Sequence, residues 1–213
     1  MIKKLWIYDV IDKKACFSSN FVVKNIFMVN LTNQIIKIQN NINFINKLEE
    51  LRKINESRPV VFLCVGSSKI WYDSFGPMMG TLLQYLGVEN YVYGNLKSNV
   101  LGNNIENYIS LIHSFHIDPY IVVLDCAISE SEDFYLKIYE GETQCAYFSN
   151  RSTSVGDLSL NCVVPKNKID NCEGFNNIVK LCKKLAFFIK FVFIENEVKL
   201  FYWFLTNKNI VFL

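Results

Sequence analysis

The sequence predicts an α/β fold with a mostly parallel central sheet, and two observations lead to this prediction. Residues 59–65 and 120–124 are short, continuous apolar runs rich in β-branched residues, as in strands that are buried on both faces. Strand-like and helix-like segments then alternate between residues 59 and 125. This order favours parallel strands joined by right-handed crossovers, because each helix returns the chain to the same edge of the sheet.

The segments up to residue 95 are expected to supply two helices and two strands. Residues 33–55 carry isoleucines near helical spacing and then a charged turn, which predicts an amphipathic helix outside the core. The strand at 59–65 comes next. Pro77 suits the first turn of a second helix, and Gly87 should end that helix. Residues 91–93 have a pattern typical of a short second strand.

The remaining segments are expected to complete the sheet and to cover it. Asn103 or Asn104 can cap a helix that runs to Phe115, because asparagine is a good N-cap residue. The third strand, 120–124, should end at Asp125. Further expected elements are a hairpin of 134–139 and 144–148 around Gly141, a strand at 158–164 and a long apolar helix at 173–193.

Length and composition indicate one folded domain with appendages. The chain has 213 residues, of which 51% are hydrophobic and 20% are charged, so a sizeable core is expected. We divide it into an N-terminal extension with the amphipathic helix (1–57), an α/β core (58–194) and an apolar C-terminal tail (195–213). Charged residues interrupt the apolar stretches near the C-terminus, so no membrane span is expected.

Charge, cysteine usage and motifs argue against several classes of protein. The 22 Lys and Arg residues nearly balance the 20 Asp and Glu residues, which argues against a nucleic-acid partner. The seven cysteines show no C-x-x-C pair and no zinc-type spacing, so we expect reduced thiols and a cytoplasmic protein. Gly66-Ser67-Ser68-Lys69 is neither a P-loop nor a dinucleotide fingerprint. His113 and His116 lack a third ligand in register, so we expect no cofactor and no metal.

Two acids carry the functional hypothesis. Asp73 follows the loop after the first buried strand, and Asp125 ends a later strand. Their separation of 52 residues (125 − 73 = 52) holds two βα units, which would bring both acids to one cleft at the strand ends. One carboxyl would then keep its proton, and the other would act as a base toward water. The simpler alternatives are a helix cap for Asp73 and a bond to a loop backbone for Asp125.

Three further polar residues are candidate substrate contacts. Asn95 and Asn99 lie in the polar loop after residues 91–93, where they could orient a substrate or only shape the turn. Asp157 follows Gly156 just before the strand at 158–164. Stabilising a tight turn is the simpler role for Asp157.

Five segments in a fixed order carry a family resemblance. They are Phe62-Leu63-Cys64-Val65-Gly66, Asp73-Ser74-Phe75-Gly76-Pro77-Met78-Met79-Gly80, Val92-Tyr93-Gly94-Asn95-Leu96, Leu124-Asp125-Cys126-Ala127 and Ser154-Val155-Gly156-Asp157-Leu158-Ser159-Leu160. Through them residues 60–164, and more loosely those up to Phe193, resemble the YyaC-type sporulation proteins. That family is remotely similar to the germination protease of spore formers and to hydrogenase maturation endopeptidases.

The resemblance implies a three-layer α/β/α fold of the phosphorylase/hydrolase type, a protease-like core and a role in sporulation. It also implies that Asp73 and Asp125 match the two acids tied to activity in the germination protease. The sequence departs from the family pattern at three places. Tyr72 stands where the family has Gly, Ser68 stands where it has an Asp, and Asn99-Val100-Leu101 replaces Pro-Val-His.

Two classes of function are therefore carried forward. The first is an aspartate-dependent peptidase that acts on a protein or peptide. The alternative is a catalytically inactive binding or regulatory protein of sporulation on the same fold, which the three departures favour. A third class, a nickel-dependent maturation protease, would need a histidine that has no match in this chain. The expected location is the cytoplasm of the sporulating cell or the spore, and the apolar tail with Phe201, Trp203 and Phe204 would offer a homodimer surface.

Overall fold

The structure is a computed structural model that describes residues 37–38, 41–88, 90–146, 152–170, 172–190 and 192–193. All of these residues belong to one compact unit, Ile35–Lys208. Residues 1–36 and the apolar tail 195–213 lie outside the described residues. The division of the chain at residues 57 and 194, and the homodimer surface expected on the tail, therefore stay predictions.

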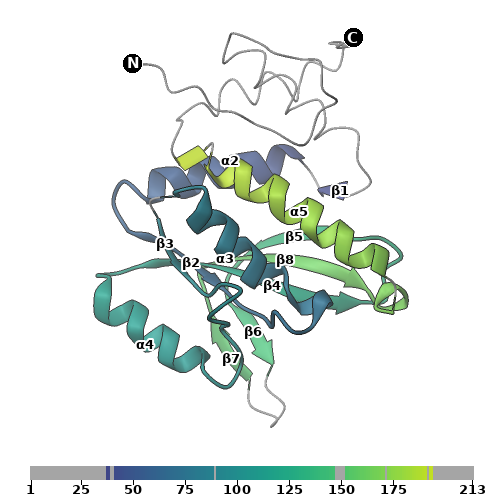
Figure 1. Ribbon diagram of the computed structural model, residues 1–213. Coiled ribbons are helices and arrows are strands. Elements are labelled where there is room, and N and C mark those ends of the chain that lie inside the picture. The colour runs from purple at the N-terminus through teal and green to yellow at the C-terminus, as the bar shows by residue number, and fades with distance from the viewer. Residues whose placement is uncertain are drawn as a thin grey trace, which may run out of the picture. The chain divides into compact units, whose positions relative to one another are not determined.

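A mostly parallel sheet forms the centre of this unit (Figure 1). Its strands are β1 (Lys37–Ile38), β2 (Val60–Cys64), β3 (Tyr91–Tyr93), β4 (Tyr120–Ser129), β5 (Tyr135–Glu140) and β8 (Leu158–Pro165). They lie in the order β1-β5-β8-β4-β2-β3. All neighbours pair in parallel except β5 and β8, which are antiparallel. The fold class predicted from the sequence is confirmed.

Helices cover both faces of the sheet, which makes three layers. The helices are α2 (Asn41–Ile54), α3 (Phe75–Tyr85), α4 (Ile105–Phe115) and α5 (Cys172–Lys190). Helices α3 and α5 pack against each other on one face of the sheet, and α4 lies on the other face (Figure 1). The α/β/α arrangement is thus present, and the helices predicted before Gly87, up to Phe115 and over 173–193 are confirmed.

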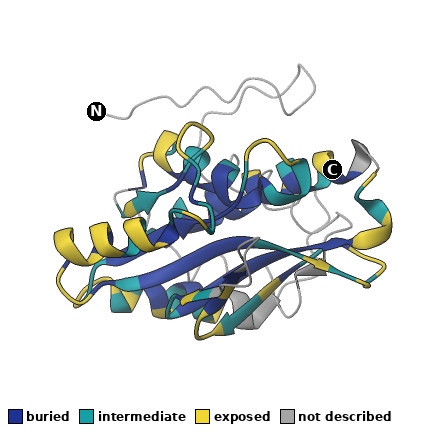
Figure 2. Cartoon of the chain, turned by 90° about the horizontal axis from the view of Figure 1, so that it is seen from below, coloured by how far each residue is buried: buried dark blue, intermediate teal, exposed yellow. Residues whose placement is uncertain are grey.

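The core explains why the central strands appear as unbroken apolar runs. Strands β2 and β8 are buried along their whole length. Figure 2 shows buried strands, in dark blue, between the helices that cover the sheet. Val61, Leu63 and Val123 pack with Ile105 and Ile112 of α4. The alternate residues of these strands face α3 and α5, so both faces of the sheet are covered and both need apolar side chains.

Strand β4 is longer than predicted, and this changes the setting of Asp125. The prediction ended the strand at Asp125, but β4 continues to Ser129. The reason is tertiary: β8 pairs with β4 as far as Ser129, whereas β2 pairs with it only as far as Leu124. Asp125 is therefore the first residue of β4 beyond its pairing with β2.

The predicted hairpin around Gly141 is wrong. β5 pairs with β8 and β1 in the central sheet, whereas β6 (Thr143–Ala146) pairs with β7 (Ser152–Val155) in a separate two-stranded sheet. Gly141, at φ 101°, turns the chain out of one sheet and into the other. The sequence pattern shows the turn but not the partner of each strand.

Two predicted helix starts also need correction. The helix expected from residue 33 begins at Asn41, because Lys37 and Ile38 pair with β5 instead. Asn104 stands at the N-cap position of α4, but its side chain does not cap the helix. Its Oδ1 accepts the Leu101 N–H, and its Nδ2 donates to the Asn99 carbonyl, so the amide is used within the preceding loop.

The first turn of α3 lies directly on the ends of β2 and β4. A Cβ added at Gly76 would overlap the Val65 carbonyl oxygen and would stand 2.6 Å from the Leu124 carbonyl oxygen. One turn later, a Cβ at Gly80 would overlap the Gly94 carbonyl oxygen. Only glycine allows this approach, so the face of α3 that meets the strand ends is defined by these two positions.

We expect Gly76→Ala to destabilise the protein by about 1–3 kcal/mol, because the methyl group must displace main-chain carbonyls rather than a flexible side chain. Urea unfolding would measure the change. Tyr85→Ala on the same helix is the matched control, since Tyr85 is 86% exposed and should change stability by less than about 0.5 kcal/mol. Equal unfolding midpoints for the two variants would contradict the close packing at Gly76.

Candidate functional site: an acidic pair at the carboxyl ends of parallel strands

A tight loop returns the chain from β2 to Asp73. Gly66 leaves the strand at φ 130°, a conformation that glycine adopts without strain. The 3-10 helix η1 (Trp71–Asp73) follows, and the Ser67 N–H donates to Asp73 Oδ2 at 2.8 Å and to the Asp73 carbonyl oxygen at 3.0 Å. Asp73 does not cap α3: Ser74 occupies the N-cap position. Backbone contacts therefore hold Asp73 beside the end of β2.

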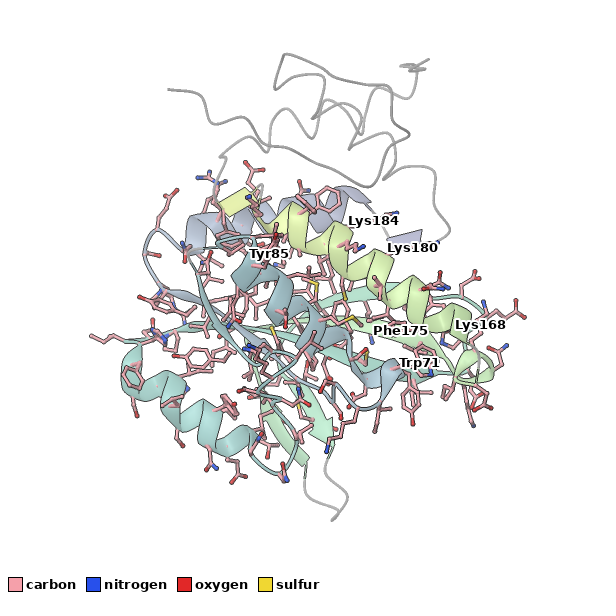
Figure 3. All side chains as sticks on the ribbon, viewed as in Figure 1. Trp71, Tyr85, Lys168, Phe175, Lys180 and Lys184 are labelled. Carbon is pink, nitrogen blue, oxygen red and sulfur yellow. The ribbon has the colours of Figure 1, made fainter. Side chains whose placement is uncertain are left out.

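Trp71 fastens η1 to the start of α5. Its indole Nε1–H donates to the Ile169 carbonyl oxygen at 2.9 Å. Its ring lies so close to Gly174 that a side chain there would overlap it. Figure 3 shows Trp71 and Phe175 at the same end of α5. Two contacts therefore hold the turn that carries Asp73: the Ser67 N–H binds the Asp73 carboxylate, and the Trp71 indole binds the segment just before α5.

Asp125 is almost fully buried at the same edge of the sheet. It is 9% exposed, and its Oδ1 accepts the N–H of Cys126 at 2.8 Å. Burial raises the pKa of Asp125 to about 7, because the charged form loses its hydration. The bond from Cys126 opposes this rise, since it favours the charged form. A carboxyl with this pKa is part protonated and part ionised near neutral pH.

Asp73 and Asp125 lie within electrostatic reach of each other. After burial, the negative charge of Asp73 raises the pKa of Asp125 further. Burial also raises the pKa of Asp73, and the Ser67 N–H opposes that rise. Asp73 is the less buried of the two and ionises first, so the repulsion falls on Asp125. The pair can therefore hold one proton and one negative charge, which is the state that acid/base catalysis needs.

The loop after β3 meets the loop that carries Asp73. Asn99 Oδ1 accepts both the Ser68 N–H at 3.0 Å and the Ser68 hydroxyl at 2.9 Å. Asn95 Oδ1 accepts the backbone N–H groups of Lys97 and Ser98, which shapes a turn. These polar atoms are engaged within the loops, so a direct substrate contact by Asn95 or Asn99 stays a prediction.

Asp157 lies away from the acidic pair. Its Oδ2 accepts the Ile121 N–H at 2.7 Å, and its own N–H donates to the Ile121 carbonyl oxygen at 2.8 Å. Ile121 is at the opposite end of the β2–β4 pairing from Asp125. Asp157 therefore ties the start of β8 to β4, and we leave it outside the proposed site.

A row of polar residues beside Asp125 was not predicted from the sequence. Asn161 of β8 is the register partner of Asp125, and Lys137 of β5 is the register partner of Asn161. Asn161 is 8% exposed, and its Nδ2 donates to the Tyr139 hydroxyl at 3.2 Å. The sequence does show one asparagine, Asn161, inside the apolar run 158–165. That Asn161 lies beside Asp125 depends on strand order and register, which cannot be read from the sequence.

The described histidines and cysteines do not form a metal site. His116 is buried beneath Tyr91 and shares a 2.7 Å hydrogen bond with the Tyr93 hydroxyl, while His113 is exposed. Cys64, Cys126, Cys145, Cys162 and Cys182 are free. Across the part of the chain that the structure describes, three or more His, Cys, Asp or Glu side chains nowhere gather as metal ligands would. Within the same residues, none of the helices combines the length and apolarity that crossing a membrane requires.

Comparisons with known proteins identify one sequence relative and one solved structure that this chain resembles. The chain is 28% identical over 121 residues to "Uncharacterized protein YyaC" of Bacillus subtilis (strain 168); the match covers 55% of this chain and 56% of that protein. The chain thus spans little more than half the length of this relative. Among solved structures, a [NiFe] hydrogenase maturation protease HycI from Thermococcus kodakarensis KOD1 matches with 16% identity and a TM-score of 0.43, over 66% of this chain and 99% of that one.

The fold and the site define a class: a three-layer α/β protein with two interacting carboxyls at the carboxyl ends of neighbouring parallel strands. The family follows from the sequence match. Residues 28–187 match the family described as "Protein of unknown function (DUF1256)", so the chain belongs to it. The resemblance to YyaC-type proteins seen in five segments is thereby confirmed.

Stability should fall as pH rises from about 4 to about 7. Between its ordinary pKa of 3.8 and its folded pKa of about 7, Asp125 binds a proton in the folded protein that the unfolded chain has released. The difference, 7 − 3.8 = 3.2, corresponds to a loss of about 4 kcal/mol on going to high pH. Urea unfolding at a series of pH values would measure it.

Asp125→Asn is the control for this experiment, because it removes the titrating group and keeps its size. The variant should lose the slope that comes from Asp125 and keep those of the other shifted groups, namely the fall that comes from the raised pKa of Asp73 and the opposite rise that comes from the lowered pKa of His116. A constant difference in stability between wild type and Asp125→Asn from pH 4 to pH 8 would rule out the raised pKa of Asp125.

Proposed function

We propose that the protein is an aspartate-dependent peptidase that acts on a protein or peptide substrate in sporulation. The observation that carries the proposal is the position of the two acids: Ser67 holds Asp73 beside the end of β2, and Asp125 is the first residue of β4 beyond its pairing with β2, where burial and then the charge of Asp73 raise its pKa. In open parallel sheets, ligands bind outside the carboxyl ends of the strands. Two carboxyls that share one proton are the arrangement with which aspartic peptidases cleave amides without a metal.

The proposed reaction uses the two acids in different protonation states. Ionised Asp73 takes a proton from a water molecule as the water oxygen attacks the scissile carbonyl carbon. Neutral Asp125 donates its proton to the amide nitrogen, and the C–N bond breaks to give a carboxylic acid and an amine. The step leaves the proton on Asp73 and the charge on Asp125, and exchange of a proton with water restores the starting state. The assignment follows burial: Asp125 is the more buried carboxyl and keeps its proton to higher pH.

The cellular setting is proposed from the family resemblance and from the thiols. The resemblance of residues 60–164 to YyaC-type proteins supports a role in sporulation. Cys64, Cys126, Cys145, Cys162 and Cys182 are free, which suits a reducing compartment such as the cytoplasm of the sporulating cell or the spore.

A binding or regulatory protein on the same fold is the second candidate, and one observation favours it. One carboxylate oxygen of each acid accepts a hydrogen bond from a backbone N–H, that of Ser67 for Asp73 and that of Cys126 for Asp125, as is common for carboxylates with a structural role. Ser68, which replaces a family Asp, is tied to Asn99. Such a protein would bind its partner without cleaving it.

Single Asp73→Asn and Asp125→Asn variants distinguish the two candidates. Each variant should lower the rate of peptide cleavage by at least about 100-fold, because each removes one member of the acid/base pair. The measurement is mass-spectrometric detection of new peptide termini after incubation with candidate spore proteins.

Asp170→Asn is the matched control, since Asp170 is exposed and outside the site. It should cleave at the wild-type rate. Unchanged cleavage by either site variant would reject the acidic pair as the catalyst. Binding of a spore protein without new termini, equal in wild type and both variants, would favour the regulatory protein.

A further inference from the structure

Asn161 leaves a buried acceptor without a partner. Among the described residues, its Oδ1 is the one buried side-chain nitrogen or oxygen atom that has no hydrogen bond. An unpaired buried acceptor lowers the stability of the folded protein by about 1–3 kcal/mol, so such atoms are rare and each one needs an explanation. A neighbouring group that can donate a hydrogen bond in only one of its protonation states would explain why this acceptor is unpaired.

A directional chain of hydrogen bonds fixes the orientation of the Asn161 amide. The Ser159 hydroxyl donates to the Gly141 carbonyl oxygen at 2.9 Å, and the Thr143 hydroxyl donates to Ser159 Oγ. Because the only hydroxyl hydrogen of Thr143 is used there, the Tyr139 hydroxyl must donate to Thr143 Oγ1, at 3.2 Å. Tyr139 then accepts the Asn161 amide N–H at 3.2 Å.

This chain forbids the flipped amide. If Asn161 were turned over, its Oδ1 would meet the Tyr139 oxygen, whose hydrogen is already given to Thr143. Two acceptors would then face each other with no proton between them. Nδ2 therefore stays on Tyr139, and Oδ1 stays open on its other side.

Asp125 is the group placed to supply the missing donor. It is the register partner of Asn161 on the adjacent parallel strand, so the two side chains project from the same face of the sheet. Asn161 Oδ1 is buried from bulk solvent, so a side chain beside it is the direct candidate for its donor. Oδ1 of Asp125 accepts the Cys126 N–H, which leaves Oδ2 to carry a proton.

We propose that neutral Asp125 donates a hydrogen bond from its carboxyl Oδ2–H to Asn161 Oδ1, and that this bond breaks when Asp125 ionises. Asn161 is then a positioning residue: its Oδ1 stabilises the protonated form of Asp125 and fixes the orientation of the Asp125 carboxyl group. The proposal rests on the proposed function only in making Asp125 the acid of the pair; the hydrogen bond itself does not require catalysis.

The charged and titratable groups around Asp125 agree with this assignment. Asp73 on η1 favours the neutral form of Asp125, because two negative charges would repel. The thiols of Cys126 and Cys145 are neutral, since burial raises the pKa of both. Lys137, on the far side of Asn161, places its Nζ 5.0 Å from the centre of the Tyr139 ring.

NMR titration of the full, isotope-labelled chain tests the bond without a substrate. We expect the Asn161 side-chain ¹³Cγ and ¹⁵Nδ2 signals to shift with pH at the same midpoint as the Asp125 ¹³Cγ signal. The amide of exposed Asn103 is the control and should show no such step. Asn161 signals that stay unchanged through the titration of Asp125 would overturn the proposal.

Two substitutions of Asp125 sharpen the test. Asp125→Asn supplies a permanent N–H donor, so the Asn161 ¹³Cγ signal should stay at its low-pH position at every pH. Asp125→Leu supplies no donor, so the signal should stay at its high-pH position. The same position in both variants would contradict the bond.

A double-mutant cycle of Asp125→Leu and Asn161→Leu adds an independent readout. The coupling between the two sites should be favourable at pH 5.5 and lost at pH 8.5; equal coupling at both pH values would overturn the proposal. If these variants fail to fold, the wild-type titration still decides. A matched titration in a protein that cleaves no peptide would support the bond and reject only the peptidase.

Discussion

The contact between the first turn of α3 and the ends of β2 and β4 is the constraint on which the site depends. At Gly76 the helix backbone meets the carbonyl oxygens of Val65 and Leu124, so no side chain fits between them. This contact determines where η1 must lie, and η1 carries Asp73. Asp125 is the next residue of β4 after Leu124, and its burial raises the pKa of its carboxyl.

Burial and charge then divide the roles of the two acids. Asp73 keeps a larger exposed fraction and is supported by one backbone N–H, so it ionises first. Asp125 is deeper, feels the charge of Asp73 and holds its proton to about neutral pH. Burial, with the charge of Asp73 added to it, thus gives two identical side chains different pKa values.

The face of the sheet that carries Asp125 is polar at one end and apolar at the other. Val61, Leu63 and Val123 pack beneath α4, whereas Asp125 and Asn161 lie further along the same face. The hydroxyls of Ser159, Thr143 and Tyr139 connect this polar end to the backbone at Gly141. A fully bonded chain of this kind is rigid, so it can hold one acceptor open in a defined direction.

The sequence by itself determined the fold class, the central strands and the helices around them, because strands buried on both faces require unbroken apolar runs such as 59–65. It also singled out Asp73 and Asp125, since polar residues at the ends of such runs stand out. It could not show that β4 continues past Asp125, that β5 and β6 belong to different sheets, or that Asn161 lies beside Asp125. Those features depend on which strands pair and in which register, and only the tertiary structure decides this, because strand partners are chosen by contacts between residues far apart in the chain.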